Sequence, residues 1–226
     1  MNIEKYDEIR ASLPAGVRLI AVSKFKPAED IALLYQHGQR AFGENHAQEM
    51  KAKHEELPKD IEWHFIGHLQ TNKIKYIAPY VALIHSIDSF SLLQEVNKYA
   101  EKNNRVIPCL LQFHIADEET KFGFTLEECE AMLQSPEFQQ LQNIAIHGVM
   151  GMATFTDDQE QVRREFHHLH QIFEELRTRY FSQNPDFKEL SMGMTDDYPI
   201  AISEGSTLIR IGSAIFGPRN YQTCDV

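Results

Sequence analysis

The sequence predicts an α/β fold, a single (β/α)8 TIM barrel with an extra N-terminal helix. Short β-rich runs alternate with helical patterns along almost all of the 226 residues, which is typical of a parallel sheet with helical crossovers. Eight such units can be counted, and a closed barrel of eight units takes about 250 residues. No long linker divides the chain, so we expect one domain over residues 1–226. An open doubly wound sheet is the alternative on pattern alone.

The first four units follow a polar helix expected at residues 3–13. The apolar run at residues 18–23 predicts a buried strand, and Pro27 then opens a helix for which Gly38 is a natural end. Further strands are expected at residues 40–43, 62–66 and 81–86. The last two of these strands are followed by helices at about residues 70–77 and 89–102.

The last four units contain the clearest helical period in the chain. Strands are expected at residues 106–113, 144–150, 187–191 and 207–211, with a helix at about residues 126–133 and a short helix that ends at Gly205. Apolar side chains recur at spacings of three and four after the sixth strand; they are Val162, Phe166, Leu169, Phe173, Leu176 and Tyr180. These spacings predict an amphipathic helix against the sheet.

Charge and composition exclude several classes of protein. The chain has 22 Lys and Arg against 33 Asp and Glu, a net charge of −11, which argues against nucleic-acid and anionic-membrane partners. No apolar run approaches the roughly 20 residues that span a bilayer. The charged N-terminus is unlike a signal peptide, and the three widely spaced cysteines form no disulfide or metal motif. We therefore expect a cytoplasmic protein.

Polar and glycine residues gather at the C-terminal ends of the expected strands, where barrel enzymes carry their sites. The last two strand ends, Ser191-Met-Gly-Met194 and Arg210-Ile-Gly-Ser213, are rich in glycine and hydroxyl residues. Glycine lets the backbone approach an anion closely, and N–H groups and hydroxyls donate to it. These two loops indicate a phosphate site.

Two cationic residues occupy unusual positions. Lys24 directly follows the first strand, where partial burial would lower the pKa of its amine and make it nucleophilic towards an aldehyde. A surface lysine is the alternative, and strand period does not settle whether Lys24 or Lys26 faces inward. Arg210 lies within the last strand, where a buried guanidinium needs either a carboxylate or a ligand atom as acceptor.

These residues belong to motifs that span the chain. They are Ala21-Val-Ser-Lys-Phe-Lys-Pro27, Phe42-Gly-Glu-Asn45, Trp63-His-Phe-Ile-Gly67 with Leu69-Gln-Thr-Asn-Lys73, Leu190-Ser-Met-Gly-Met194 and Ile209-Arg-Ile-Gly-Ser-Ala-Ile-Phe-Gly217. With these motifs the chain resembles the pyridoxal-phosphate homeostasis proteins of the YggS/PROSC type. That family is similar to the N-terminal barrel domain of alanine racemase.

The resemblance implies a site for pyridoxal 5'-phosphate (PLP). It implies an internal aldimine on Lys24, phosphate contacts from Ser191, Gly212 and Ser213, a contact between Arg210 and the pyridine nitrogen, and Asn45 close to the cofactor. The chain departs from the family's pattern at Phe25, His114 and Thr195, where Thr, Asn and Ser are more common. No metal site is expected, since His167 and His170 share a helix face without a third ligand.

The function implied is storage and delivery of PLP in vitamin B6 homeostasis, with little or no turnover. Arg210 would favour an unprotonated pyridine, a poorer electron sink, and the chain ends soon after Gly217, where alanine racemases continue into a second domain with a catalytic tyrosine. We expect a monomer that meets apo-PLP enzymes transiently, with Lys26 and Lys121 accepting the cofactor during delivery. The alternatives are a PLP-dependent fold-type III enzyme, such as an amino-acid racemase, and a phosphate-metabolite barrel enzyme without PLP.

Overall fold

Eight parallel strands close into a barrel in the computed structural model, which describes residues 1–117 and 122–218. The strands are β1 (Arg18–Val22), β2 (Ala41–Glu44), β3 (Glu62–Phe65), β4 (Leu83–Ile87), β5 (Ile107–Gln112), β6 (Ile144–Met150), β7 (Glu189–Ser191) and β8 (Leu208–Ile211). Each strand pairs with the next along the chain, and β8 pairs in parallel with β1. This last pairing confirms the predicted barrel and excludes the open doubly wound sheet.

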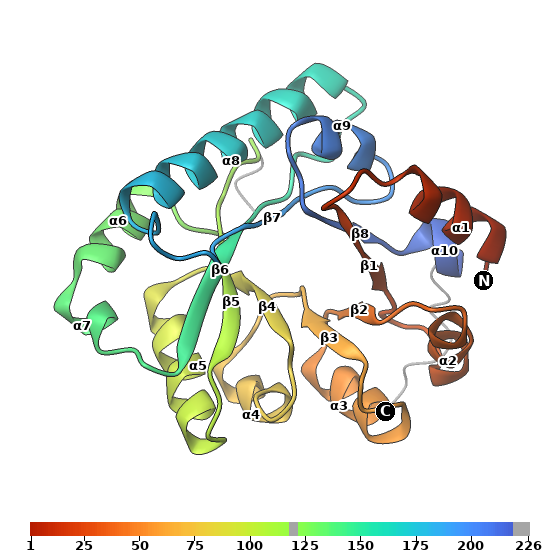
Figure 1. Ribbon diagram of the computed structural model, residues 1–226, viewed down its shortest axis with the longest axis horizontal. Helices are drawn as coiled ribbons and strands as arrows, with labels where there is room; N and C mark the ends of the chain where they lie inside the picture. The colour runs from red at the N-terminus through yellow and green to blue at the C-terminus, as the bar shows by residue number, and fades with distance from the viewer. Residues whose placement is uncertain (118–121, 219–226) are drawn as a thin grey trace.

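Helices surround the strands, as Figure 1 shows. They are α1 (Ile3–Ser12), α2 (Ala28–Gln36), α3 (Ala47–Glu56), α4 (Ile74–Ile77), α5 (Phe90–Lys102), α6 (Leu126–Gln134), α7 (Pro136–Gln139), α8 (Gln159–Arg179), α9 (Tyr198–Ser203) and α10 (Ser213–Phe216). The predicted N-terminal helix α1 lies beside α10 (Figure 1). A hydrogen bond of 2.7 Å from Asn2 N to Ile215 O joins the two.

Local capping chemistry explains where several helices begin. Thr125 and Glu128 form a capping box at the start of α6, and Ser89 and Asp158 cap α5 and α8 with their side chains. Each cap satisfies N–H groups that the first turn leaves without a partner. The structure corrects several expected bounds. The segment expected as one helix at residues 70–77 begins with a 3-10 turn before α4. The strand expected at residues 81–86 runs from Leu83 to Ile87, and the strand expected at residues 187–191 runs from Glu189 to Ser191.

The barrel has two apolar layers. The larger layer packs between the strands and the surrounding helices, and it includes Trp63 and Phe65 from β3. The smaller layer is Ile20, Leu83, Leu110, Met150 and Leu208, contributed by five different strands. Inward-facing side chains of this kind fill the interior of such barrels, so polar side chains inside it need explanation. None of the helices in the described ranges combines the length and apolar character needed to cross a membrane.

Candidate functional site

The turn after β1 carries Lys24 and is tied to α3 on both sides of that residue. The Ser23 carbonyl accepts a hydrogen bond of 2.8 Å from Lys53 Nζ, and the Phe25 N–H donates to Glu49 Oε1 at 2.7 Å. Phe25 has a φ of 60°, a left-handed conformation that is uncommon for a bulky residue. Because both neighbours of the half-buried Lys24 are held, backbone contacts set the position from which its side chain extends.

A buried carboxyl lies next to this turn. Glu44, the last residue of β2, is fully buried, and its Oε1 accepts from Ser23 Oγ at 2.6 Å and from Lys53 Nζ at 2.8 Å. Its Oε2 has no hydrogen-bond partner in the described part of the chain. Burial raises the pKa of the Glu44 carboxyl to about 7, and the charge of Lys53 opposes this rise. The Lys24 turn therefore contacts, through Ser23, a carboxyl whose pKa lies near neutral pH.

Asn45 follows β2 at the same end of the barrel. Its Oδ1 is buried and lacks a hydrogen-bond partner among the described residues. Leaving a buried polar atom unpaired costs about 1–3 kcal/mol. The adjacent backbone is tightly enclosed, because a Cβ on Gly67 would lie only 2.4 Å from the Asn45 carbonyl oxygen. Asn45 Oδ1 is thus an acceptor that a donor from a ligand could satisfy.

Arg210 projects a buried guanidinium from β8 into the barrel. It is only 4% exposed, and its Nη1 and Nη2 donate to Ser191 Oγ at 2.6 Å and to Gly151 O at 3.2 Å. Within residues 1–117 and 122–218 no carboxylate lies within ion-pair distance of it. Burial lowers the pKa of Arg210 to about 10, an effect that the charge of Asp197 partly offsets. The guanidinium therefore stays charged at neutral pH, and its hydrogen-bond acceptors among the described residues are neutral.

Two histidines adjoin this arginine inside the barrel. Ser191 Oγ also lies 2.9 Å from His85 Nδ1, and His85 Nε2 lies 2.9 Å from His64 Nδ1. Burial lowers the pKa of both imidazoles, that of His85 most strongly. From the sequence, His64 is noted only as part of the motif Trp63-His-Phe-Ile-Gly67, and His85 is not singled out. Its one available signal was a lone imidazole in the otherwise apolar run before Ser86.

The loops after β7 and β8 meet through their hydroxyl groups. Ser213 Oγ donates to Thr195 Oγ1 at 3.2 Å, and the Arg210 N–H donates to Gly193 O at 2.9 Å. Ser213 also begins α10, whose first N–H groups have no acceptor within the helix. The hydroxyls of the two loops are therefore in contact, next to the start of α10. Thr195 was noted in the sequence only as a departure from the family pattern.

Strand order brings the other predicted residues together. Lys24, Asn45 and Gly212 follow the neighbouring strands β1, β2 and β8, and a Cβ on Gly212 would lie 3.2 Å from Val22 O. Ser191 lies deeper, with its hydroxyl in contact with Arg210 and His85 as described, so its phosphate contact stays a prediction.

Of the two lysines expected to act in delivery, Lys26 is among the described residues. Lys26 Nζ donates to Pro218 O at 2.8 Å, which places its amine beside the segment after α10. Lys121 lies outside the described residues.

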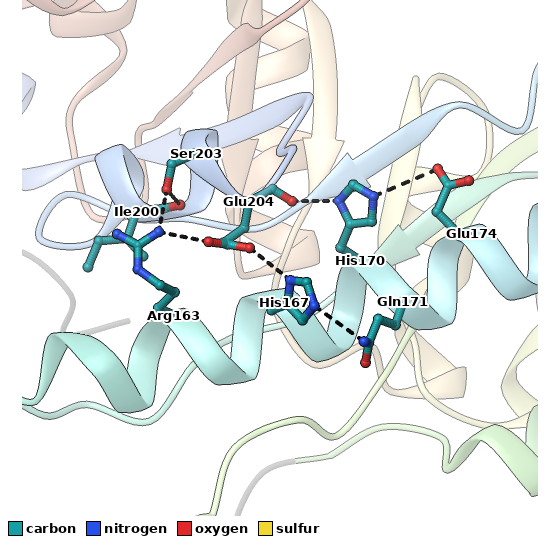
Figure 2. A network of polar contacts seen from close by, with 8 residues as sticks. All are labelled: Arg163, His167, His170, Gln171, Glu174, Ile200, Ser203 and Glu204. Carbon is teal, nitrogen blue, oxygen red and sulfur yellow. Dashed lines mark hydrogen bonds and ion pairs between the residues drawn. The ribbon is translucent and has the colours of Figure 1, made fainter.

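A polar network anchors α9, the helix that follows the Thr195 loop. Glu204 Oε1 accepts from Arg163 Nη1 at 2.7 Å, and its Oε2 lies 3.1 Å from His167 Nδ1. His170 Nδ1 donates to the Glu204 carbonyl at 2.6 Å. Figure 2 shows these contacts joining α8 to the end of α9. His167 and His170 therefore hold a helix in place. The described residues contain no group of three His, Cys, Asp or Glu side chains that could hold a metal ion.

The class of protein follows from comparison with known families. Residues 3–220 match the family described as "Alanine racemase, N-terminal domain". This match covers almost the whole barrel, including both loops and the Lys24 turn. The chain is therefore a barrel of the alanine racemase N-terminal-domain class.

More similar relatives identify the particular family. The pyridoxal phosphate homeostasis protein of Aquifex aeolicus is 40% identical over 205 residues, 90% of this chain and 88% of the relative. That of Haemophilus influenzae is 39% identical over 210 residues, 92% and 87% of the two chains. PipY of Synechococcus elongatus PCC7942, solved with PLP bound, superposes with a TM-score of 0.84 and 36% identity, covering 95% of this chain and 99% of PipY. The chain belongs to the pyridoxal phosphate homeostasis protein family.

Proposed function

We propose that the protein binds PLP at the mouth of the barrel and serves vitamin B6 homeostasis by holding and releasing it. The observation that carries this proposal is the buried, charged Arg210, which contacts neutral acceptors alone in the described structure. A buried cation of this kind is costly unless a further partner compensates it. Membership of a family in which PipY has been solved with PLP bound supports the same ligand.

The groups around the mouth fit the parts of this ligand. The hydroxyls of Ser213 and Thr195, with the N–H groups at the start of α10, suit a phosphate. Arg210 suits the pyridine nitrogen because a guanidinium has donors only. Asn45 Oδ1, which has no hydrogen-bond partner in the described part of the chain, suits a ring substituent that donates. The ligand's charge also suits the site, since an anion brought into an acidic chain needs local cations and donors.

Lys24 is the residue to which we assign the covalent attachment. When bound, PLP supplies an aldehyde carbon to which a primary amine can attach reversibly with loss of water. The chain's part is to hold that amine at the mouth, through the contacts of Ser23 and Phe25 with α3. Glu44 lies behind the same turn and can hold a proton near neutral pH. A reversible attachment of this kind suits storage of a reactive aldehyde.

We further propose that the protein performs little or no turnover. Arg210 directs only N–H donors at its neighbours and stays protonated, so it disfavours a proton on the pyridine nitrogen. An unprotonated ring assists carbanion chemistry poorly. The competing function is a fold-type III enzyme such as an amino-acid racemase. The observation that favours it is the description of the matched family, "Alanine racemase, N-terminal domain". Incubation of the PLP-loaded protein with L-alanine, followed by chiral chromatography, should give no D-alanine above the rate of free PLP.

The phosphate assignment has a direct binding test. Titration with PLP and with pyridoxal, which lacks the phosphate, should show PLP binding at least about 100-fold more tightly, because several charge-assisted hydrogen bonds are lost without it. The variants Ser213→Ala and Thr195→Val should weaken PLP binding and leave pyridoxal binding unchanged. Equal affinities for the two vitamers in the wild-type protein would contradict the proposed phosphate cradle.

Delivery to other proteins forms the remaining part of the proposal. We propose that the protein acts as a single-domain monomer that meets apo-PLP enzymes transiently, with Lys26 and Lys121 assisting release. The rate at which an apo-enzyme regains activity from the loaded protein should fall in Lys26→Ala and Lys121→Ala. Unchanged rates in both variants would remove these lysines from the proposal.

A further inference from the structure

A continuous chain of polar contacts crosses the barrel interior behind Arg210. Arg210 Nη1 lies 2.6 Å from Ser191 Oγ, which lies 2.9 Å from His85 Nδ1. His85 Nε2 lies 2.9 Å from His64 Nδ1, and His64 Nε2 lies 4.0 Å from Glu62 Oε2. The first four residues are buried, whereas half of the Glu62 side chain is exposed. This series of contacts therefore joins the proposed ligand site to a carboxylate at the start of β3.

The residues at the two ends of this series of polar contacts, Arg210 and Glu62, fix the direction in which protons are donated along it. Arginine has donors only, so Ser191 Oγ must accept from Arg210. The Ser191 hydroxyl can then donate its own proton to His85 Nδ1. A neutral imidazole carries one proton, so the His85 proton sits on Nε2 and is donated to His64 Nδ1. The His64 proton in turn sits on Nε2 and faces the Glu62 carboxylate.

The opposite direction leaves groups unsatisfied. It would place a proton on His85 Nδ1 and leave the Ser191 hydroxyl proton without an acceptor, because Ser191 Oγ has only Arg210 and His85 as hydrogen-bond partners among the described residues. It would also turn the lone pair of His64 Nε2 towards the Glu62 carboxylate. The pKa of the Glu62 carboxyl is lowered, with its interaction with His64 as the largest cause. At 4.0 Å between His64 Nε2 and Glu62 Oε2 this is an ion-pair contact, longer than a hydrogen bond.

We propose that His85 and His64 are positioning residues for Arg210: by accepting the Ser191 proton, they leave Ser191 Oγ oriented as an acceptor that holds the guanidinium in place. This inference rests on the proposed function, in which Arg210 faces the pyridine nitrogen. In this proposal the histidines act on Arg210 through Ser191, the residue that His85 contacts. Their substitution should therefore alter the environment of the ring more than the stability of the barrel.

Neutral imidazoles are required for this arrangement, because a doubly protonated His85 would donate to Ser191 and reverse the link. The charged groups that face the pair come from four strands: Arg18 of β1, Glu62 of β3, Glu189 of β7 and Arg210 of β8. Arg18 is itself paired with Glu189 at 2.9 Å. The burial that lowers both imidazole pKa values keeps the two rings neutral at physiological pH.

The first test needs no ligand. Nitrogen-15 NMR of the ligand-free protein should show both His64 and His85 as neutral Nε2–H tautomers at pH 7. A proton on His85 Nδ1, or a positively charged His85, would overturn the proposal. The tautomers are measured without PLP, so this result does not depend on PLP binding. If the protein does not bind PLP, the proposed function fails while the tautomer result still stands, and the two failures can be told apart.

The second test uses two substitutions of one residue. In His85→Asn the amide oxygen can take the place of Nδ1 and still accept from Ser191, whereas the longer side chain of His85→Gln places its amide near the position of Nε2. The absorption spectrum of bound PLP and its Kd should stay near the wild-type values in His85→Asn. In His85→Gln the spectrum should shift and the Kd should rise about tenfold, the cost of one misplaced buried hydrogen bond.

Stability measurements separate positioning from packing. Urea unfolding of both ligand-free variants shows how much each substitution costs the barrel, and Ser191→Ala should reproduce the spectral shift of His85→Gln. Equal spectra and equal Kd values in the Asn and Gln variants would overturn the proposal, as would a larger effect in His85→Asn. If either variant fails to fold, the tautomers in the wild-type protein still decide the question.

Discussion

Gly193 meets two requirements that a residue with a side chain could not meet easily: a left-handed backbone conformation and a close approach to α9. Its φ of 95° lies in the left-handed region that side-chain-bearing residues rarely adopt, and a Cβ there would lie 2.6 Å from the Cβ of Ala201. The glycine lets the loop after β7 turn closely over α9. That turn places Thr195 beside Ser213, so one backbone conformation supports the proposed phosphate cradle.

Gly193→Ala should therefore destabilise the protein by about 2–4 kcal/mol, since it adds backbone strain and a steric overlap. Gly16→Ala is the matched control, because Gly16 has a φ of 91° but a Cβ at this position would meet no atom within 4 Å. The control should lose only the backbone contribution, about 1 kcal/mol. Urea unfolding measures both values, and equal losses would show that contact with α9 is unimportant.

The carboxyl of Glu44 links stability to pH. Its pKa in the folded protein, about 7, lies above the ordinary value of 4.5, mainly because of burial. The protonated form is thus favoured by folding. The resulting stability is fully present below pH 4.5 and is lost as the pH rises through 7.

Comparison with Glu44→Gln should isolate this effect. The free energy of unfolding of the wild-type protein should fall relative to that of the variant by about 1–3 kcal/mol between pH 5 and 8. Urea unfolding at several pH values gives the difference directly. A difference that is constant with pH, or that grows in favour of the wild type, would show that the ionised carboxyl is well accommodated by Lys53.

Contacts between elements hold the site's loops in position. Helix α9 is joined to α8 through Glu204, which accepts from Arg163 and contacts His167. The two partners of Glu204 are substantially exposed, and exposed ion pairs contribute only about 0–1 kcal/mol each. The network is therefore expected to orient α9, and with it the Thr195 loop, more than to stabilise the barrel.

Glu204→Ala should change ligand binding more than stability. We expect a loss of less than about 1 kcal/mol in unfolding free energy and a threefold to tenfold increase in the Kd for PLP, roughly the 0.7–1.4 kcal/mol of a mispositioned loop. Glu175→Ala is the control, since Glu175 pairs with Arg179 within α8. Equal PLP affinities in the two variants would indicate that α9 keeps its place without Glu204.

The elements were more predictable from sequence than their mutual contacts. Alternation of apolar runs identified all eight strands and the N-terminal helix, and small polar residues marked the loops after β7 and β8. Lys53 and Glu49 escaped notice because they lie on a mostly polar helix and act through contacts with a distant turn. In retrospect the buried positions Ala47, Met50 and Lys53 recur every three residues, which is a helix-face pattern with a lysine where an apolar residue is expected.

Closure of the barrel explains why residues from distant parts of the chain form one site. Pairing of β8 with β1 brings the Gly212 backbone next to the strand that leads to Lys24. Parallel pairing also sets all strand ends at one rim, so residues distant in sequence converge there. His85 shows the limit of sequence reasoning at this scale, since its partners His64 and Ser191 become apparent only when β3, β4 and β7 surround a common interior.

The most direct measurement of the central claim is borohydride reduction of the PLP-incubated protein followed by peptide mass mapping. The proposed function predicts one pyridoxyl-modified residue, Lys24, and loss of that modification together with the visible absorbance in Lys24→Ala. Lys26→Ala controls for the neighbouring amine, which contacts Pro218 O instead of the Lys24 turn, and should keep the label on Lys24. A label on Lys26 or another lysine, with Lys24 unmodified, would contradict the assignment of the site.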